Sequence, residues 1–473
     1  MTLSNKINSG FNKTIVSFIV LIFLLILFWV VPKGADELII WPCLLIFYFY
    51  FITSIRKPII IVPGIPTFFK IEVFFLLFYY ILFYFPYQKY VLGFYNLKEN
   101  FFLQNTYIEY TNISILACTI GLISFMEGFR KKIYLKKKHK VKDYSQVQYN
   151  KLFNIVFIFL IFLLVVFSLT GLQSYLINTY TGSDTGDTTT NGIYFIISVF
   201  MLFLSGFSLI FYKRFKKVKY LFYVLCATYS ILLVISGDRN TFFVIAVSLV
   251  AGFYTYIKEI NRYKIIFYIF LALYLYQVIE ISRNSEKRGF NAIVSAMSVW
   301  NEPEVDVKVD KSSFSITTTA TRIGFVMVPE KIDYFYGKFK IVGIAGIIPY
   351  SRSLFVDPND KFVTSTDVLI LGSGTTWSVG SSIIADIYFD FGILGVIVLM
   401  YFLGYFANFI QQKAQLNPNS IKWGVLYLIT FSLYSQISRY SFDFIARFIV
   451  WTLLIFWIFE YTNVKKIKQI KNY

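Results

Sequence analysis

Long apolar runs alternate with short polar connections along nearly the whole chain. A helix needs roughly 20 apolar residues to cross the hydrocarbon core of a bilayer, and the runs have about this length. The first run lacks a small-residue cleavage pattern, so we interpret it as a retained anchor. The pattern predicts an all-α polytopic membrane protein with about twelve transmembrane helices, at 14–31, 38–55, 71–86, 113–129, 152–170, 193–212, 220–235, 241–257, 265–281, 391–410, 423–438 and 440–459.

The amino-acid composition supports this class. Hydrophobic residues make up 57% of the 473 residues, and charged residues make up only 15%. Soluble domains carry about 25% charged residues, so the composition excludes an ordinary soluble protein.

The net charge of +19 is distributed in a regular way along the chain. Basic clusters occupy every second loop and both termini, whereas the short loops 32–37, 181–187 and 237–240 are neutral or acidic. Positively charged loops stay cytoplasmic, so both termini are predicted to be cytoplasmic. Because the charge pattern follows the membrane topology, we expect no nucleic-acid partner.

One outer loop, at 282–380, is far longer than the others. It divides the chain into helices one to nine (1–281), a large extracytoplasmic, periplasmic loop, and helices ten to twelve with a basic C-terminal tail (381–473). Apolar residues at helical spacing predict short amphipathic helices at the membrane interface for 289–300 and 314–327. The acidic string 301–310 is either a cation site or a solvated linker, and its charge pattern favours the linker. Long loops are usually functional, so we expect this loop to handle the substrate.

The sequence gives little indication of a metal-binding or cofactor-binding site. The three cysteines lie inside predicted spans, and His139, the single histidine, lies in a basic cytoplasmic loop. A structural or catalytic zinc site needs several Cys, His or carboxylate ligands together. We therefore expect no metal and no cofactor.

The predicted last helix contains charged residues, which are costly within a membrane. Arg439, Asp443 and Arg447 follow each other at intervals of four residues, so a continuous helix would place them on one face. Two interpretations remain open. The three side chains form a self-neutralising ladder, or they line an outward-facing cavity that binds an anion.

Further arginines lie at the predicted outer ends of other helices. Arg239 follows Asp238 at the tip between two apolar runs. Asn240 and Thr241 are candidate caps of the next helix, and Asp238 is either an N-cap of that helix or the residue that orients Arg239. Arg283 and Arg288 lie at the outer end of the ninth helix. Each is a surface charge when considered alone. Together they favour binding of a multiply charged anion such as a diphosphate, because guanidinium groups bind phosphate through two parallel hydrogen bonds.

The segment 371–395 combines glycines and serines with the start of a predicted helix. Serine is a favourable helix N-cap, and a helix N-terminus attracts anions. Asp386 and Asp390 lie four residues apart on one helical face. Either carboxylate is a candidate general base, and Asp390 is equally a candidate cap or arginine partner.

Three stretches resemble one known family. "GDRN" (237–240), "VPEKIDYFYGKFKIVGIAGIIPYSR" (328–352) and "SSIIADIYFDFGILG" (381–395) are similar to motifs of the O-antigen polysaccharide polymerases, the Wzy-type oligosaccharide repeat-unit polymerases. The resemblance spans roughly 230–395. It departs from the family at Asp386, where glutamate is the more usual residue.

The resemblance implies a GT-C-like membrane glycosyltransferase of the bacterial inner membrane. Such an enzyme joins undecaprenyl-diphosphate-linked oligosaccharide units into O-antigen or a related surface polysaccharide at the outer face of the membrane, without metal or cofactor. Its expected partners are the lipid-linked substrate and membrane lipids, with a chain-length regulator and a flippase as further candidates.

The resemblance and the charge pattern together define a candidate site. We expect three residues to have catalytic roles. Asp386 is the base, and Arg239 and Arg352 bind phosphate or position the sugars. Substrate binding falls to five further arginines and two aromatic side chains that stack on sugar rings: Arg283, Arg288, Arg322, Arg439, Arg447, Trp377 and Tyr388.

Two other functions compete with polymerisation. An O-antigen ligase-type glycosyltransferase shares the expected layout, but the resemblance implies that ligases use a histidine in the large outer loop, where this chain has none. A lipid-linked oligosaccharide flippase or transporter would show inverted repeats and polar residues at the bilayer midplane. Here the charged residues lie toward the predicted outer side.

Overall fold

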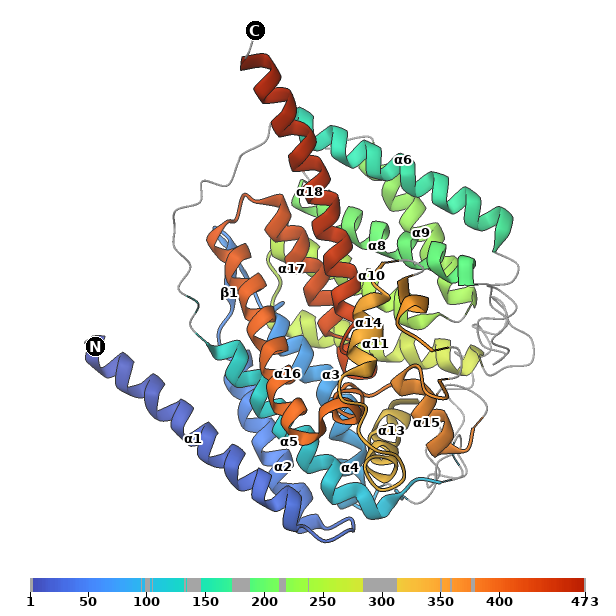
Figure 1. Cartoon of the computed structure of the whole chain (residues 1–473). Helices are drawn as coiled ribbons and strands as arrows, with labels where there is room; N and C mark the ends of the chain where they lie inside the picture. The colour runs from blue at the N-terminus through green and yellow to red at the C-terminus, as the bar shows by residue number, and fades with distance from the viewer. Residues whose placement is uncertain are drawn as a thin grey trace.

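In the part of the chain that the structure describes, the fold is helical apart from one small hairpin (Figure 1). The computed structural model describes thirteen stretches of the chain, namely residues 3–94, 96–97, 103, 105–131, 133, 146–171, 188–211, 218–236, 238–283, 313–348, 351–357, 360–375 and 379–471. The predicted interfacial helix at 289–300 and the acidic string 301–310 lie outside these residues.

Each predicted apolar run lies mostly on helix, although the last run, 440–459, begins four residues before its helix. The helices are α1 (Leu3–Val30), α2 (Glu37–Ile55), α3 (Ile71–Phe83), α4 (Phe85–Val91), α5 (Thr111–Arg130), α6 (Gln146–Thr170), α8 (Thr188–Ile210), α9 (Val218–Ser236), α10 (Arg239–Tyr256), α11 (Arg262–Arg283), α16 (Ile383–Leu416), α17 (Ile421–Tyr434) and α18 (Phe444–Lys471). The strands β1 (Ile59–Val62) and β2 (Ile65–Thr67) pair antiparallel between α2 and α3.

Among the described residues, seven helices are long and apolar enough to cross a membrane. An eighth span is formed if α3 and α4, which meet at an angle of 49°, cross together. Three shorter apolar helices lie within α1, α10 and α17. The prediction of a multi-pass helical membrane protein is confirmed, and the count of twelve spans stays a prediction.

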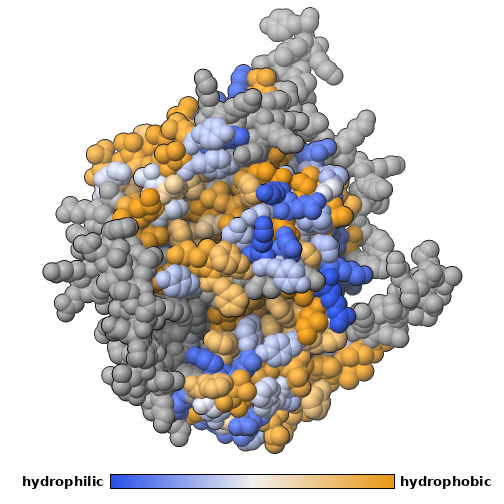
Figure 2. Space-filling view, turned by 180° about the vertical axis from the view of Figure 1, so that it is seen from behind, coloured by the Kyte–Doolittle hydropathy of each residue, from blue (hydrophilic) through white to orange (hydrophobic). Residues whose placement is uncertain are grey.

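The outer surface of the helix bundle is apolar, as a lipid-facing surface requires. Large hydrophobic side chains are exposed along α1, α2, α6 and α9, among them Phe18, Leu45, Ile158 and Val224. Seen from behind, apolar side chains cover broad areas of the described surface, with a group of hydrophilic residues between them (Figure 2).

Helices α5 and α16 pack tightly against each other near the centre of the bundle (Figure 1). Gly404 makes this contact possible, because a Cβ atom there would lie 1.9 Å from the carbonyl oxygen of Phe125. Gly128 of α5 faces the backbone of Tyr401 in the same way. Small residues at such positions let two membrane helices approach closely.

The long loop contributes α13 (Ser313–Met327), α14 (Lys338–Ala345), the 3₁₀ helix η2 (Ser351–Leu354) and α15 (Ser365–Ser373). A helix at 314–327 is confirmed, but its placement at the membrane surface is wrong. All side chains from Ser315 to Val328 are buried, because α13 packs against α3, α5, α15 and α16. Its threonines bond carbonyl groups of the preceding turn, such as Thr321 Oγ1 to Thr317 O at 2.8 Å, which removes the cost of burying them.

Helix α16 is kinked at Gly392, whose φ of 62° and ψ of −160° are not helical. A positive φ is unstrained only for glycine. The kink separates an N-terminal helical segment, which contains Asp386 and Asp390, from the long apolar remainder of α16.

The prediction that Arg439, Asp443 and Arg447 share one face of a continuous helix is wrong. Helix α17 ends at Tyr434, the 3₁₀ helix η3 covers Ile437–Arg439, and α18 begins only at Phe444. The amide of Phe442 donates to Asp386 Oδ2 at 2.9 Å, so this donor bonds a side chain of α16 instead of a carbonyl one turn earlier.

Candidate active site

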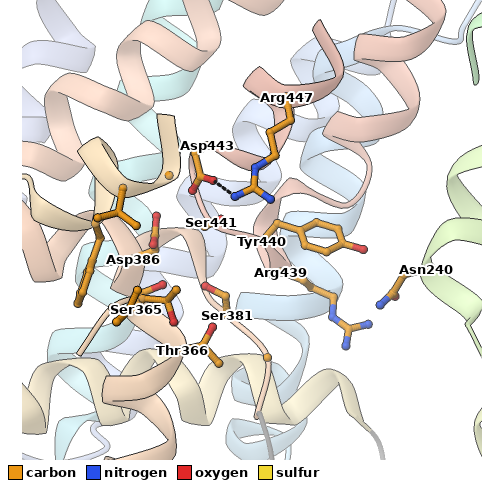
Figure 3. Close-up of a pocket in the computed structure, with 16 residues that line it drawn as sticks. Asn240, Ser365, Thr366, Ser381, Asp386, Arg439, Tyr440, Ser441, Asp443 and Arg447 are labelled. Atoms are coloured by element: carbon orange, nitrogen blue, oxygen red, sulfur yellow. Dashed lines mark hydrogen bonds and ion pairs between the residues drawn. The ribbon is translucent and has the colours of Figure 1, made fainter. Parts of the chain in front are cut away.

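A cavity of about 270 Å³ lies where the N-terminal ends of four helices meet. Asn240 lines it from α10, Ser365 from α15, Asp386 from α16 and Arg447 from α18. Each helix N-terminus carries a partial positive charge from its free amide groups, so this meeting point favours a negatively charged ligand. Figure 3 shows the side chains that line the cavity.

Asp386 is the carboxylate from α16 that lines the cavity. It is only 2% exposed, and its Oδ2 accepts hydrogen bonds from Lys340 Nζ at 2.7 Å and from the amide of Phe442. The other oxygen, Oδ1, has no hydrogen bond to any described residue. One oxygen is therefore fixed by the protein, and the other is left for a ligand.

Asp390 has a different role, although it lies one turn further along the same helix. It is fully buried and accepts from the amides of Phe339 and Lys340, each at 3.2 Å. These are free amides of the first turn of α14. Asp390 is therefore a cap for α14, which was one of its three predicted roles beside general base and arginine partner.

Arg439 and Arg447 line the cavity with Asp443. Arg447 Nη2 donates to Asp443 Oδ2 at 3.2 Å, and this pair is drawn as a dashed line in Figure 3. Arg439 lies beside Asn240, on the side of the cavity away from Asp386 (Figure 3). Because the chain breaks before α18, the side chains of Arg439, Asp443 and Arg447 line one cavity instead of following each other along one helix face.

Three polar atoms of the lining have no hydrogen-bond partner among the described residues. They are Asn240 Oδ1, Ser381 Oγ and Arg447 Nε, and all three are buried from solvent. Burying such groups unpaired costs free energy, so they favour a ligand that supplies both donors and acceptors. Sugar hydroxyls and phosphate oxygens together meet this requirement.

The "GDRN" turn lies at one wall of the cavity. Asp238 is the N-cap of α10, because its carboxylate accepts from the amide of Thr241 at 3.1 Å. The expectation that Asn240 or Thr241 caps this helix is wrong, since Thr241 donates to Asp238 and Asn240 faces the cavity. Arg239 is the first residue of α10, and its side chain lies outside the described part of the chain.

Two predicted site residues lie away from this cavity. Arg322 is only 1% exposed within α13, where its Nη2 donates to Thr319 Oγ1 at 2.8 Å. Tyr388 packs its ring against Phe325, and its hydroxyl accepts from Tyr334 at 3.2 Å. Neither residue lines the cavity.

The remaining candidates are only partly described. Arg283 ends α11 and Arg352 lies in η2, but their side chains lie outside the described residues. Arg288 and Trp377 lie outside the described residues altogether. Within the described residues, no group of three or more His, Cys, Asp or Glu side chains could hold a metal ion.

Sequence reasoning missed Lys340, which bonds both Asp386 and Asp390. The residue lies in "GKFKIVG", where two lysines alternate with an aromatic residue and only one of them is buried. Ser381, Ser365 and Thr366 were also missed as lining residues. The available signal was a pair of lysines, Lys338 and Lys340, in a short helix whose other residues are apolar or glycine.

The comparisons with known proteins identify the family. The family model described as O-antigen polysaccharide polymerase Wzy matches residues 13–469, nearly the whole chain. Comparison with curated proteins and with solved structures gave no match. Because the match covers almost every residue, the chain belongs to the O-antigen polysaccharide polymerase Wzy family, which are integral membrane proteins of polysaccharide biosynthesis.

Proposed function

We propose that the protein polymerises undecaprenyl-diphosphate-linked oligosaccharide repeat units at the outer face of the bacterial inner membrane. The growing chain is the donor, and a sugar hydroxyl of a newly delivered unit is the acceptor. Family membership gives polysaccharide polymerisation in general. The observation that carries the finer proposal is that two arginines and Asp386, a carboxylate without an arginine partner among the described residues, line a single cavity.

The cavity has two chemically different ends. Arg439 lies next to Asn240 at one side, Asp386 lies at the other, and Ser381 lies between them (Figure 3). We assign the donor diphosphate to the arginine end, because guanidinium groups bind phosphate oxygens in pairs. The acceptor hydroxyl belongs at Asp386, within reach of the free Oδ1.

The proposed reaction is a single displacement at the anomeric carbon of the donor. Asp386 Oδ1 takes the proton of the acceptor hydroxyl while the hydroxyl oxygen bonds to the anomeric carbon. The bond from that carbon to the diphosphate oxygen breaks, and the lipid diphosphate leaves with the electron pair. Arg439 and Arg447 stabilise the charge that develops on it. One base and no covalent intermediate imply inversion at the anomeric centre.

The proposed orientation follows from the charge pattern. The helices α10, α16 and α18 all begin on the side that the basic loops predict to be external. The cavity lies at these N-terminal ends, so the proposal places it at the outer face. The full topology would then have twelve spans, both termini in the cytoplasm and the loop 282–380 outside. A flippase that delivers the substrate and a chain-length regulator are the proposed partners.

Deletion in the native host, followed by gel analysis of surface polysaccharide, tests the reaction class. Loss of a polymerase leaves core lipid capped with a single repeat unit. Loss of a ligase would leave bare core, and loss of a flippase would leave no exported unit. Either of the last two results would overturn the proposal, provided that plasmid-borne wild-type protein restores the polymer.

A further inference from the structure

Lys340 is a buried cation directly behind the proposed base. It lies on α14 with 7% exposure and does not line the cavity. Its ammonium group donates hydrogen bonds to Asp386 Oδ2 at 2.7 Å and to the Asp386 carbonyl at 2.8 Å, and it forms an ion pair with Asp390 Oδ2 at 3.3 Å. Because Lys340 does not line the cavity, these contacts direct its charge at the two aspartates and not at a substrate.

Two buried carboxylates share this one cation. Asp386 and Asp390 lie one turn apart, and both carboxylates contact the same ammonium group. Asp390 is held by the amides of α14, whereas Asp386 opens on the cavity. The other charged groups that line the cavity with Asp386 are Arg439, Asp443 and Arg447, and Asp443 is already paired with Arg447. Lys340 is thus the cation in direct contact with Asp386.

We propose that Lys340 is a positioning residue, which keeps Asp386 ionised and holds its Oδ2 so that Oδ1 faces the acceptor hydroxyl. This inference rests on the proposed function, in which Asp386 is the base. Lys340 acts through Asp386 and touches neither substrate. A purely structural lysine would tie α14 to α16 without affecting how the rate depends on pH.

Removal of the Lys340 cation should shift the rate–pH profile in one direction. Without Lys340, the two carboxylates repel each other in a poorly solvated place, and a more alkaline solution is needed to keep Asp386 charged. In Lys340→Met, the acidic limb of the rate–pH profile should therefore move upward by about 1 to 3 pH units. The rate on that limb should fall about tenfold for each unit of the shift.

Lys338→Met is the matched control. Lys338 lies on the same short helix and also pairs with an aspartate, Asp360, at 2.8 Å, but its side chain is 30% exposed. This variant loses a lysine and an ion pair from α14 without changing the surroundings of Asp386. Its profile should match the wild-type profile. Lys340→Arg retains the positive charge, so its limb should stay near the wild-type position even where the rate is lower.

Asp390→Asn tests the same electrostatics while Lys340 is kept. Asparagine still offers an oxygen to the amides of α14, and the charge that opposes ionisation of Asp386 is gone. The acidic limb should then move to lower pH. This variant keeps the proposal falsifiable if Lys340→Met does not accumulate in the membrane.

The experiment measures polymer formation by purified full-length variants from lipid-linked repeat units across a pH series, at matched protein amount. An upward shift for Lys340→Met, or a downward shift for Asp390→Asn, together with an unmoved Lys338→Met profile, supports the inference. If the variants that accumulate in the membrane keep the acidic limb of their rate–pH profiles at the wild-type position, the inference is overturned. Asp386→Asn distinguishes failure of this inference from failure of the proposed function. If Asp386→Asn is inactive while the acidic limbs of the other variants do not move, only the role of Lys340 is wrong. If Asp386→Asn keeps wild-type activity, the proposed function itself is wrong.

Discussion

Asp386 and Asp390 show how neighbouring carboxylates acquire different roles from their surroundings. Both lie in the N-terminal segment of α16 and both contact Lys340. Asp390 accepts hydrogen bonds from two backbone amides of α14, whereas Asp386 lines the cavity. The assignment of Asp390 as a cap, and the proposal that Asp386 is a base, rest on these contacts, which a four-residue spacing in the sequence does not reveal.

Arg447 gives a prediction at the same scale. Replacing it with alanine leaves the buried Asp443 without its ion-pair partner and removes a donor that we propose to bind the leaving diphosphate. Loss of a donor directed at developing charge costs on the order of a hundredfold in rate, and lysine should restore only part of it.

Polymerisation by the purified variants measures this effect, with Arg130→Ala as the control. Arg130 lies at the end of α5, away from the cavity, and its contact with Glu127 is long at 3.8 Å. Normal polymer from Arg447→Ala at matched expression would show that the arginine end does not bind the donor.

Asp238 tests the helix cap at the "GDRN" turn. Alanine at this position removes the acceptor for the Thr241 amide and should lower stability by about 1 kcal/mol, whereas asparagine retains the cap and should cost less. Thermal unfolding of the two variants in detergent measures the difference. Equal unfolding midpoints for Asp238→Ala and Asp238→Asn would contradict the assigned cap.

At the scale of elements, the contact between α5 and α16 holds the site in place. Helix α16 carries Asp386 at its N-terminal end and Gly404 at the contact. A methyl group at residue 404 would overlap the Phe125 carbonyl, so Gly404→Ala should separate the helices and reduce both stability and activity. At Gly192 on α8, an added Cβ meets nothing within 4 Å, so Gly192→Ala is the matched control.

The measurement for this pair is the thermal unfolding midpoint of each purified variant in detergent, with polymer yield as a second readout. Gly192→Ala should match or slightly exceed the wild type, because alanine favours helix over glycine. A Gly404→Ala protein with an unchanged midpoint would mean that the tight contact does not contribute to stability.

Helices were predictable from the sequence because apolar runs of membrane length leave few alternatives. The break before α18 was not predictable, since it depends on a hydrogen bond from Phe442 to Asp386 on a distant helix. The burial of α13 was not predictable either. Its threonine hydroxyls donate hydrogen bonds to carbonyl groups of the same helix, so residues that look like polar surface in the sequence can be buried. Arg447 and Asp386 were predictable as site residues because they are charged residues within apolar sequence. Lys340 was not, because its contact with Asp386 depends on the packing of α14 on α16.

At the scale of the whole molecule, the orientation in the membrane is open to a direct test. The native cysteines Cys43, Cys118 and Cys226 are all buried, so labelling of the unmodified protein should be low. A cysteine at the exposed Leu354 should react with an impermeant maleimide in cells whose outer membrane has been made permeable, and one at the exposed Leu416 should not. The reverse pattern would place the cavity on the cytoplasmic side and remove the basis for the proposed substrate delivery.

The central claim is that Asp386 is the base of a glycosyl transfer that uses a lipid-diphosphate donor. The most direct test is the rate at which purified Asp386→Asn joins lipid-linked repeat units, measured beside the binding of the same donor. The account predicts a loss of about 10²- to 10⁴-fold in rate, the usual contribution of a general base, with donor binding at the arginine end retained. Polymer formation at the wild-type rate by this variant would contradict the account.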